Sequence, residues 1–348
     1  MLAQKLGGSP RRWEGNSPLL SAIVSSWNRT RFLPSALDSV VNQTLNHAKY
    51  QVILNSNLDS NTTARLTTGR EIRVLYNDEE AQGRFYAKAI EAVDTDFVAF
   101  LDDDDCWDPS RLERGLAVLL SHPEIGLYHN ERQMIDVAGS PIAHRPITDR
   151  VLRKTLRTPI TVVPPFTWPN LRQAIRFGAS FNLCSCIVRR SAILPHLDVL
   201  RRILHCEDTF MFYATICSGY GVFLDPAPLT QYRIHSGNLS RGSGQSRSRK
   251  LAWHTGAVQS LEAMSKMVKT NGVPEIRRSL AHDLAYARAL RDLGALSESR
   301  RAIGQGAFSL LAHFDRYSGP ADAGLLALAS VRFVMPSVAW LIYSSVGT

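Results

Sequence analysis

The sequence predicts an α/β protein, in which helices cover both faces of a mixed, mostly parallel sheet and a helical region follows towards the C-terminus. Two observations point to this fold class. Up to residue 120, short apolar runs typical of buried strands alternate with segments that have the spacing of amphipathic helices. Beyond Lys250, strand signals become rare and helical spacing dominates.

The N-terminal elements follow one another as in a parallel sheet with crossover helices. Pro34 stands near the start of the first helix, where a missing N–H is tolerated. Asp108 is expected to cap a later helix, with Pro109 as its first residue. The expected strands cover residues 19–25, 51–54, 72–76 and 97–101, and the later helices cover about 84–93 and 111–120.

The middle of the chain is expected to be less regular, because residues 136–171 are rich in proline and arginine. A strand over residues 182–190 would place Cys184 and Cys186 on one face. A helix ending at Gly219 and a further strand follow. Later helices are expected over residues 252–267, 274–293 and 297–312.

A chain of 348 residues exceeds the usual size of a single domain. We expect an N-terminal tail over residues 1–17, an α/β domain over 18–245 and a C-terminal helical region over 246–348. The apolar stretch 324–346 is interrupted by Arg332 and Pro336, which favours a packed or interfacial helix over a membrane-spanning one.

Composition and charge narrow the class of protein. A hydrophobic fraction of 45% and a charged fraction of 20% are ordinary for a soluble protein. The five cysteines are odd in number and no second pair has zinc spacing, which favours a reducing cytoplasm over a disulfide framework. The N-terminal residues lack the continuous apolar core of a signal peptide.

The net charge of +9 indicates an anionic partner, such as nucleic acid, a membrane surface or a phosphorylated substrate. Part of the excess lies in residues 241–250, which are too rich in glycine, serine and arginine to pack. We interpret this stretch as a flexible flap or a contact for anionic lipid or glycan. Because no aromatic-interleaved RNA-binding motif lies near it, no nucleic-acid partner is expected.

Four consecutive aspartates, Asp102, Asp103, Asp104 and Asp105, end the apolar run FVAFL. Ligands of open α/β sheets bind beyond the carboxyl ends of the strands. Adjacent carboxylates repel one another unless a cation compensates them, and Mg²⁺ prefers oxygen ligands. The run therefore predicts a metal site, the alternative being a solvated acidic turn.

Two further clusters have the residue types of a catalytic site. Glu207 and Asp208 precede a predicted helix, where Asp208 is either a helix N-cap or a general base that takes a proton from a hydroxyl. His235 ends a strand in the segment YRIHSGNLS and is either structural or a metal ligand.

The three clusters, in this order, resemble the family 2 glycosyltransferases of the GT-A fold over roughly residues 17–241. The segments that carry the resemblance are SAIVSSWNRTRFLPSALDSVVNQT, QGRFYAKAIEAVDTDFVAFLDDDD, EDTFMFYATICSGYG and YRIHSGNLS. The resemblance implies a metal-dependent, inverting transfer of a sugar from a nucleotide-diphosphate donor, with Mn²⁺ or Mg²⁺ as cofactor. The acceptor would be a hydroxyl of a glycan or of a lipid-linked molecule.

The resemblance also assigns residues to roles. Asp102 and Asp104 would form the DxD pair, with Asp104 on the metal and Asp102 on the ribose or in the metal shell. Asp208 would be the base, with Glu207 beside it near the acceptor. The remaining residues implied on the donor side are Asp103, Asp105 in support of the metal, His235 near the metal or diphosphate, Asn28 and Arg29 beside the nucleotide base, and Gly83, which would allow close backbone approach.

The chain departs from the family pattern at two places. Asn55 and Ser56 stand where the family carries aspartates that contact the nucleotide base, so Asn55 would accept a hydrogen bond without charge assistance. Lys88 stands where an arginine is usual and would add only a point charge near the diphosphate. These changes leave UDP, dTDP and GDP open as donor nucleotides.

Other classes fit less well. A haloacid-dehalogenase-type phosphatase would carry its Asp-x-Asp motif on the first strand, and a P-loop nucleotidase would need GxxxxGK[ST], which is absent. An inactive sugar-nucleotide-binding or scaffold protein of a polysaccharide pathway is the alternative, against which the intact aspartates count. We expect a cytoplasmic protein, with peripheral contact to the inner face of the plasma membrane through the basic stretch and the C-terminal helices as a further option.

Overall fold

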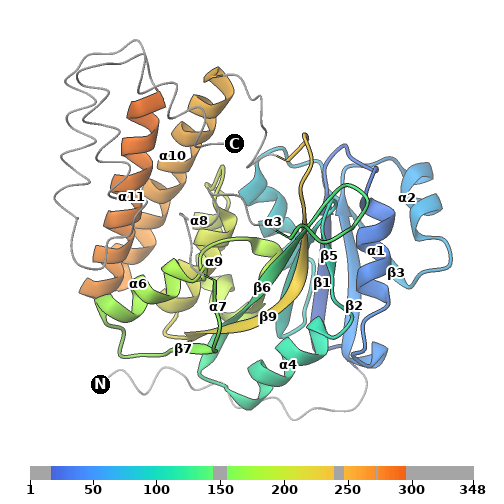
Figure 1. Ribbon diagram of the computed structural model, residues 1–348, viewed down its shortest axis with the longest axis horizontal. Coiled ribbons are helices and arrows are strands. Elements are labelled where there is room, and N and C mark those ends of the chain that lie inside the picture. The colour runs from blue at the N-terminus through green and yellow to red at the C-terminus, as the bar shows by residue number, and fades with distance from the viewer. Residues whose placement is uncertain (1–16, 144–154, 239–246, 272, 295–348) are drawn as a thin grey trace.

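The computed structural model describes residues 17–143, 155–238, 247–271 and 273–294. The fold is α/β, with a nine-stranded mixed sheet in this part of the chain and helices on both of its faces (Figure 1). The strand order is β3-β2-β1-β4-β8-β6-β9-β5, with β7 paired to β9. The strands are β1 Leu20–Ser26, β2 Tyr50–Ser56, β3 Ile72–Tyr76, β4 Phe97–Asp102, β5 Cys106–Trp107, β6 Ile125–Ile135, β7 Ile160–Val162, β8 Cys186–Arg189 and β9 Gly221–Arg233.

The direction of the strands changes at β4. Strands β1 to β4 are parallel, whereas β8 pairs antiparallel with both β4 and β6. Strand β9 runs parallel to β6 and pairs antiparallel with β5 and β7. The acidic run at the end of β4 therefore lies at the junction between the parallel and the mixed halves of the sheet.

The helices divide between two hydrophobic cores, one on each face of the sheet. On β1, Ile23 belongs to one core, while Ala22 and Val24 belong to the other, as the alternation along a strand requires. Helices α1 and α4 cover the face of Val24, and α3, α6, α9, α10 and α11 cover the face of Ile23 (Figure 1). The helices are α1 Leu33–Val41, α2 Ser60–Thr67, α3 Gln82–Glu91, α4 Arg111–Ser121, α6 Trp168–Arg176, α7 Arg190–Ile193, α8 Leu197–Leu200, α9 Glu207–Cys217, α10 Arg247–Asn271 and α11 Pro274–Gly294, with short 3₁₀ turns at His47–Lys49, Leu183–Ser185 and Leu194–His196.

The helices α10 and α11 pack against the sheet domain rather than extending away from it. Met264 and Ile276 are fully buried in the same core as Phe210 of α9. A buried polar network adds to this contact, because Asp283 accepts hydrogen bonds from Arg172 Nη1 at 2.9 Å and Tyr213 Oη at 2.7 Å. The expected division at residue 246 stays a prediction. Among the described residues, no helix has the length and apolarity to cross a membrane.

Most N-terminal elements lie where the sequence predicts them, and the differences have local causes. Helix α4 begins at Arg111 rather than Pro109, since the Asp108 carboxylate accepts hydrogen bonds from the backbone and the side chain of Ser110. Cys184 and Cys186 lie in opposite cores, because the chain makes a 3₁₀ turn at Leu183–Ser185 before β8 begins. Strand β6 was not expected, and part of the stretch expected to be irregular forms β7 and α6. The helices expected at 297–312 and 324–346 lie outside the described residues.

Gly83, in the first turn of α3, tests the packing of this helix. Its N–H donates to Ile203 O at 3.1 Å, and an added Cβ would lie 2.0 Å from Leu200 O and 2.6 Å from Ile203 O. Because both neighbours are backbone atoms, Gly83→Ala is expected to lower the free energy of unfolding by about 1–3 kcal/mol. Urea unfolding measures the change, with Arg84→Ala on the exposed face of α3 as control. Equal stability of the two variants would contradict the close packing.

Candidate active site

The candidate site lies where β1 and β4 end side by side. Ser25 of β1 is in register with Asp102, the last residue of β4. Residues Asp103, Asp104 and Asp105 follow in a turn and are buried, with exposed fractions of 2%, 7% and 1% for the whole residues. The acidic run is therefore not a solvated turn, and its charges need compensation from protein groups or a cation.

Arg29, in the loop after β1, is the cation that faces the acidic run most directly. Its Nε and Nη1 donate to Asp103 Oδ2 at 3.2 Å and Asp104 Oδ2 at 3.0 Å, and its Nη2 pairs with Asp103 Oδ1. The Arg29 side chain is partly exposed, with an exposed fraction of 38%. One partly exposed arginine thus holds two of the four aspartates.

His235 lies on the other side of Asp104, in contact with the acidic run. Its Nε2 is 3.1 Å from Asp104 Oδ2. The Gly237 N–H donates to Nδ1 at 3.1 Å, so Nδ1 is an acceptor and Nε2 carries the hydrogen towards Asp104. In this arrangement His235 is a hydrogen-bond donor to Asp104. Ligation of a metal by Nε2 would require the other tautomer.

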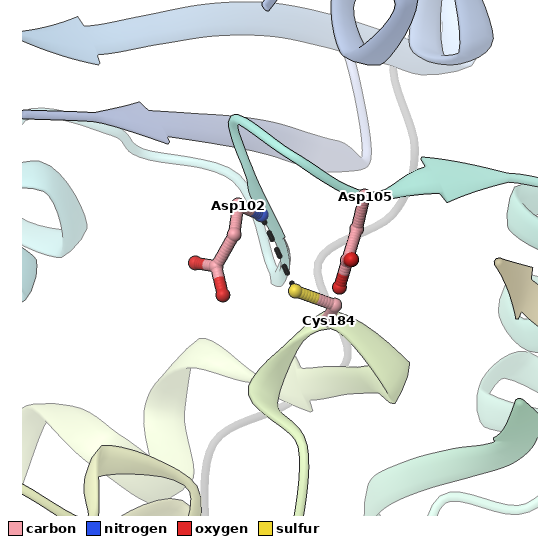
Figure 2. Close-up of side chains that lie close together, drawn as sticks. All are labelled: Asp102, Asp105 and Cys184. Atoms are coloured by element: carbon pink, nitrogen blue, oxygen red, sulfur yellow. Dashed lines mark hydrogen bonds between the residues drawn. The ribbon is translucent and has the colours of Figure 1, made fainter. Parts of the chain in front are cut away.

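Asp102 and Asp105 face a different set of groups. Tyr86 Oη donates to Asp102 Oδ1 at 3.1 Å, and the Arg233 N–H donates to Asp105 Oδ1 at 2.9 Å. Asp105 Oδ2 is buried and has no hydrogen-bond partner in the described structure. Figure 2 shows that the Cys184 side chain reaches the space between the two carboxylates.

The pKa values of Asp102, Asp103 and Asp105 are raised, because burial disfavours the charged form and the neighbouring protein groups compensate only part of the negative charge. Burial, followed by the charge of Asp104, raises the pKa of Asp102 to about 6. Burial raises the pKa of Asp103 to about 7 in spite of Arg29, which lowers it. Burial and the neighbouring Asp104 raise the pKa of Asp105 well above its ordinary value. Buried oxygens with raised pKa values, one of them unpartnered, fit a divalent cation that prefers oxygen ligands.

The predicted acidic pair begins helix α9. Helix α9 starts at Glu207 after Cys206, whose φ is +70°. Asp208 is therefore not the N-cap. Its carboxylate accepts hydrogen bonds from the backbone N–H of Asn182 at 2.8 Å and of Thr209 at 2.7 Å, which ties the helix to the preceding loop. Burial raises the pKa of Asp208, and these amide hydrogen bonds oppose the shift.

Glu207 has an environment different from that of Asp208. It is buried, and burial raises its pKa to about 8, with Asp208 and Asp102 adding to the shift. The segment 182–184 connects the α9 pair to the acidic run, because the Asn182 N–H donates to Asp208 and Cys184 Sγ accepts from the Asp102 N–H. With a pKa of about 8, Glu207 is largely protonated at neutral pH. The two amide hydrogen bonds that Asp208 accepts favour its ionised form instead.

The other predicted residues, Asn28, Asn55 and Lys88, differ from one another in their surroundings. Asn28 lies next to Arg29 and exchanges two 2.9 Å hydrogen bonds with the side chain of Asn57, which joins the loops after β1 and β2. Asn55 is fully buried, and its Oδ1 accepts from Asn77 Nδ2 at 2.8 Å. Lys88 is on the outer side of α3, 3.7 Å from Asp78.

Gly83 also has a role other than the expected one. The close backbone approach that its lack of a side chain permits is to Leu200 and Ile203 of the protein itself. The structure thus brings Arg29 and His235 into contact with the acidic run. Glu207 lies near enough to Asp102 for that charge to raise its pKa.

Sequence reasoning missed several residues that complete the site. Tyr86, Cys184 and Arg233 contact the acidic run, and Asn182 contacts Asp208. The sequence could have indicated Arg233, because this residue lies only two positions before His235, where β9 ends. For Cys184 the sequence offered only an apolar, strand-like context, which does not distinguish a site residue from a core residue.

Comparison with known proteins agrees with this geometry. Residues 21–193 match the family model described as glycosyl transferase family 2. The UDP-Glc:alpha-D-GlcNAc-diphosphoundecaprenol beta-1,3-glucosyltransferase WfgD of Escherichia coli is 26% identical over 165 residues, which cover 43% of this chain and 64% of that protein. The chain spans between about a third and two thirds of the length of the curated relatives that it matches first.

Solved structures show the same fold. S. aureus TarS 1–349 in complex with UDP has a TM-score of 0.56 at 11% identity, covering 90% of this chain and 91% of that one. The mannosyltransferase PcManGT from Pyrobaculum calidifontis, in complex with GDP-Man and Mn²⁺, has a TM-score of 0.56 at 15% identity, covering 95% of this chain and 85% of that one. The fold is the GT-A fold. Residues 21–193 of the chain belong to the family 2 glycosyltransferases.

The raised pKa of Glu207 has a consequence for stability. Between its ordinary value of 4.5 and about 8, the folded protein keeps the proton of Glu207 while the unfolded chain has lost it. The free energy of unfolding therefore falls as pH rises through this interval. Glu207→Gln is expected to reduce this fall by at least about 1 kcal/mol, because one pKa unit corresponds to about 1.4 kcal/mol.

Urea unfolding at the two ends of the interval measures the effect. Part of the slope is expected to remain in the variant, since Asp102 and Asp103 have pKa values raised in the same direction. Glu262→Gln, which changes an exposed glutamate, serves as the control. Parallel pH profiles for Glu207→Gln and wild type would show that Glu207 ionises normally.

Proposed function

We propose that this protein is a metal-dependent, inverting glycosyltransferase that moves a sugar from a nucleotide-diphosphate donor to a hydroxyl of a glycan or lipid-linked acceptor. One observation carries the proposal. Within a family 2 domain, a buried run of aspartates lies at the carboxyl end of β4, and a second carboxylate pair with a different environment lies nearby at the start of α9. These are the groups that a displacement at an anomeric carbon with a diphosphate leaving group requires.

The donor side would consist of the acidic run. Asp104 and Asp102 would hold Mn²⁺ or Mg²⁺, with Asp105 and His235 in support, and the cation would neutralise charge on the leaving diphosphate. Asp104 Oδ2 is now held by Arg29 and His235, so we expect Arg29 to turn towards the diphosphate when donor and cation bind. The Mn²⁺ bound with GDP-Man in PcManGT supports this arrangement.

The acceptor side would depend on Asp208. In a single displacement, the acceptor oxygen attacks the anomeric carbon, the bond to the diphosphate breaks, and the hydroxyl proton passes to a carboxylate. Glu207, with its pKa raised to about 8, largely holds a proton already at neutral pH. Asp208, held by two backbone N–H groups, is the carboxylate suited to accept it, while Glu207 would donate a hydrogen bond to the acceptor.

The nucleotide base would bind at the loops after β1 and β2. Asn28 and Asn57 hold these loops together, and Arg29 lies beside them. Asn55 is buried at the end of β2, and its side chain is already hydrogen-bonded to Asn77. It would contact a nucleotide base only after that hydrogen bond breaks. WfgD is named for UDP-Glc and PcManGT is bound to GDP-Man, so the relatives leave the nucleotide open for this chain.

The acceptor, the membrane and the compartment complete the proposal. The E. coli relative acts on a diphosphoundecaprenol-linked sugar, which supports a lipid-linked acceptor. A cytoplasmic location with peripheral contact through residues 241–250 and the C-terminal helices fits such an acceptor. Much of this basic stretch lies outside the described residues, so the contact rests on sequence.

Replacement of the proposed base separates catalysis from donor binding. Asp208→Asn is expected to lower kcat by at least about 100-fold, the usual contribution of a general base, with the KM for the donor unchanged. Release of nucleoside diphosphate from a panel of UDP-, dTDP- and GDP-sugars with Mn²⁺ first identifies the donor and then measures both constants.

The control for this variant is Asp198→Asn, which changes an aspartate with a 91% exposed side chain. Because the asparagine introduced by Asp208→Asn would offer only one acceptor oxygen to two N–H groups, thermal unfolding must show that the variant is folded. A kcat within a few-fold of wild type would remove Asp208 from the role of base. No turnover of any donor by the wild-type protein would favour the inactive sugar-nucleotide-binding alternative.

A further inference from the structure

Cys184 lies directly against the acidic run, in a position that the proposed transfer reaction does not use. The 3₁₀ turn Leu183–Ser185 places its Sγ 3.3 Å from the backbone N–H of Asp102, which donates to it. The sulfur, one carboxylate oxygen of Asp102 and one of Asp105 all lie within 4.8 Å of one another (Figure 2). Asp102 is partly exposed, and the other two residues are buried.

Asp105 gives an independent indication that a ligand is missing from this cluster. Its Oδ1 accepts from the Arg233 N–H, but its Oδ2 is buried without a hydrogen-bond partner in the described structure, in a residue with 1% exposure. The neighbouring Cys184 thiol is at best a weak donor. A carboxylate oxygen left in this state costs free energy, which a bound cation would recover.

The surrounding charges separate this cluster from the rest of the acidic run. Arg29 holds Asp103 and Asp104, and His235 holds Asp104 as well. The available ligand atoms next to Cys184 therefore belong to Asp102 and Asp105. A set of two carboxylates and one thiolate differs from the all-oxygen sets that suit Mg²⁺ and Mn²⁺, because sulfur prefers Zn²⁺ and similar cations.

We propose that Asp102, Asp105 and Cys184 form a binding site for one thiophilic divalent cation such as Zn²⁺, with a fourth coordination position open on the side of Asp102. Three protein ligands and one open position are a common zinc arrangement, with bond lengths of about 2.0–2.3 Å. Binding forms a metal–sulfur bond and releases the thiol proton to solvent.

The site has a consequence for the proposed transfer reaction. Asp102 and Asp105 would both belong to the donor site and to the thiophilic site, and two cations at adjacent carboxylates repel each other. Zn²⁺ would therefore inhibit sugar transfer by competing with the donor and its Mn²⁺ or Mg²⁺. This consequence rests on the proposed function, whereas the binding of the cation does not.

Titration of the purified full chain with Co²⁺ tests the site, because Co²⁺ substitutes for Zn²⁺ and gives a thiolate-to-cobalt charge-transfer band. We expect this band to saturate at one Co²⁺ per chain, to disappear on addition of Zn²⁺, and to persist in excess Mg²⁺. Cys184→Ser is expected to lose the band. Cys186→Ser, which changes a buried cysteine two residues away in the opposite core, is expected to keep it.

Circular dichroism confirms that both variants are folded, and X-ray absorption of the wild-type cobalt complex detects a sulfur neighbour without any substitution. Co²⁺ binding without a sulfur neighbour, or a charge-transfer band that survives in Cys184→Ser, would overturn the proposal. None of these readouts uses a sugar donor. A protein that binds Co²⁺ through Cys184 but transfers no sugar when assayed with Mn²⁺ or Mg²⁺ in the absence of Co²⁺ and Zn²⁺ would refute the proposed function and leave the cation site standing.

Discussion

The four adjacent carboxylates at the end of β4, three of which are buried, are the constraint on which the rest of the structure depends. Water compensates little of their charge, because Asp103, Asp104 and Asp105 are nearly inaccessible. Protein groups must therefore do so, and they come from distant parts of the chain. Arg29 follows β1, Tyr86 lies on α3, Arg233 is the last residue of β9, and His235 lies just beyond it. The compensation is incomplete, as the raised pKa values and the unpartnered Asp105 oxygen show.

The sheet topology explains how these groups reach one point. Strand β4 lies between β1, which is parallel to it, and β8, which is antiparallel. The end of β4 therefore meets the loop after β1 on one side and the turn before β8, with Cys184, on the other. Strand β5 follows the acidic turn and pairs with β9, which holds Arg233 and His235 beside the aspartates. Helix α9 then brings its carboxylate pair to the same region.

The elements that the sequence predicts well are those whose pattern is local. The apolar runs of β1, β3 and β4 and the helical spacing of α4 depend only on neighbouring residues, and the four aspartates indicate a site by themselves. Strand β6 was missed because its centre contains Asn130 and Glu131, which are buried only through partners such as Thr230 in β9. The contacts of Cys184 and Arg29 likewise depend on which strands are neighbours in the sheet. No local sequence pattern encodes that strand order.

The proposed function requires that the acidic run bind a nucleoside diphosphate through a divalent cation. Calorimetric titration of the protein with UDP, dTDP, GDP and CDP, each with and without Mn²⁺, tests it most directly. We expect that one nucleotide binds, that binding requires Mn²⁺, and that Asp104→Ala abolishes it while the exposed Asp198→Ala does not. Binding that is independent of Mn²⁺ and of Asp104, or no binding of any nucleotide, would contradict it.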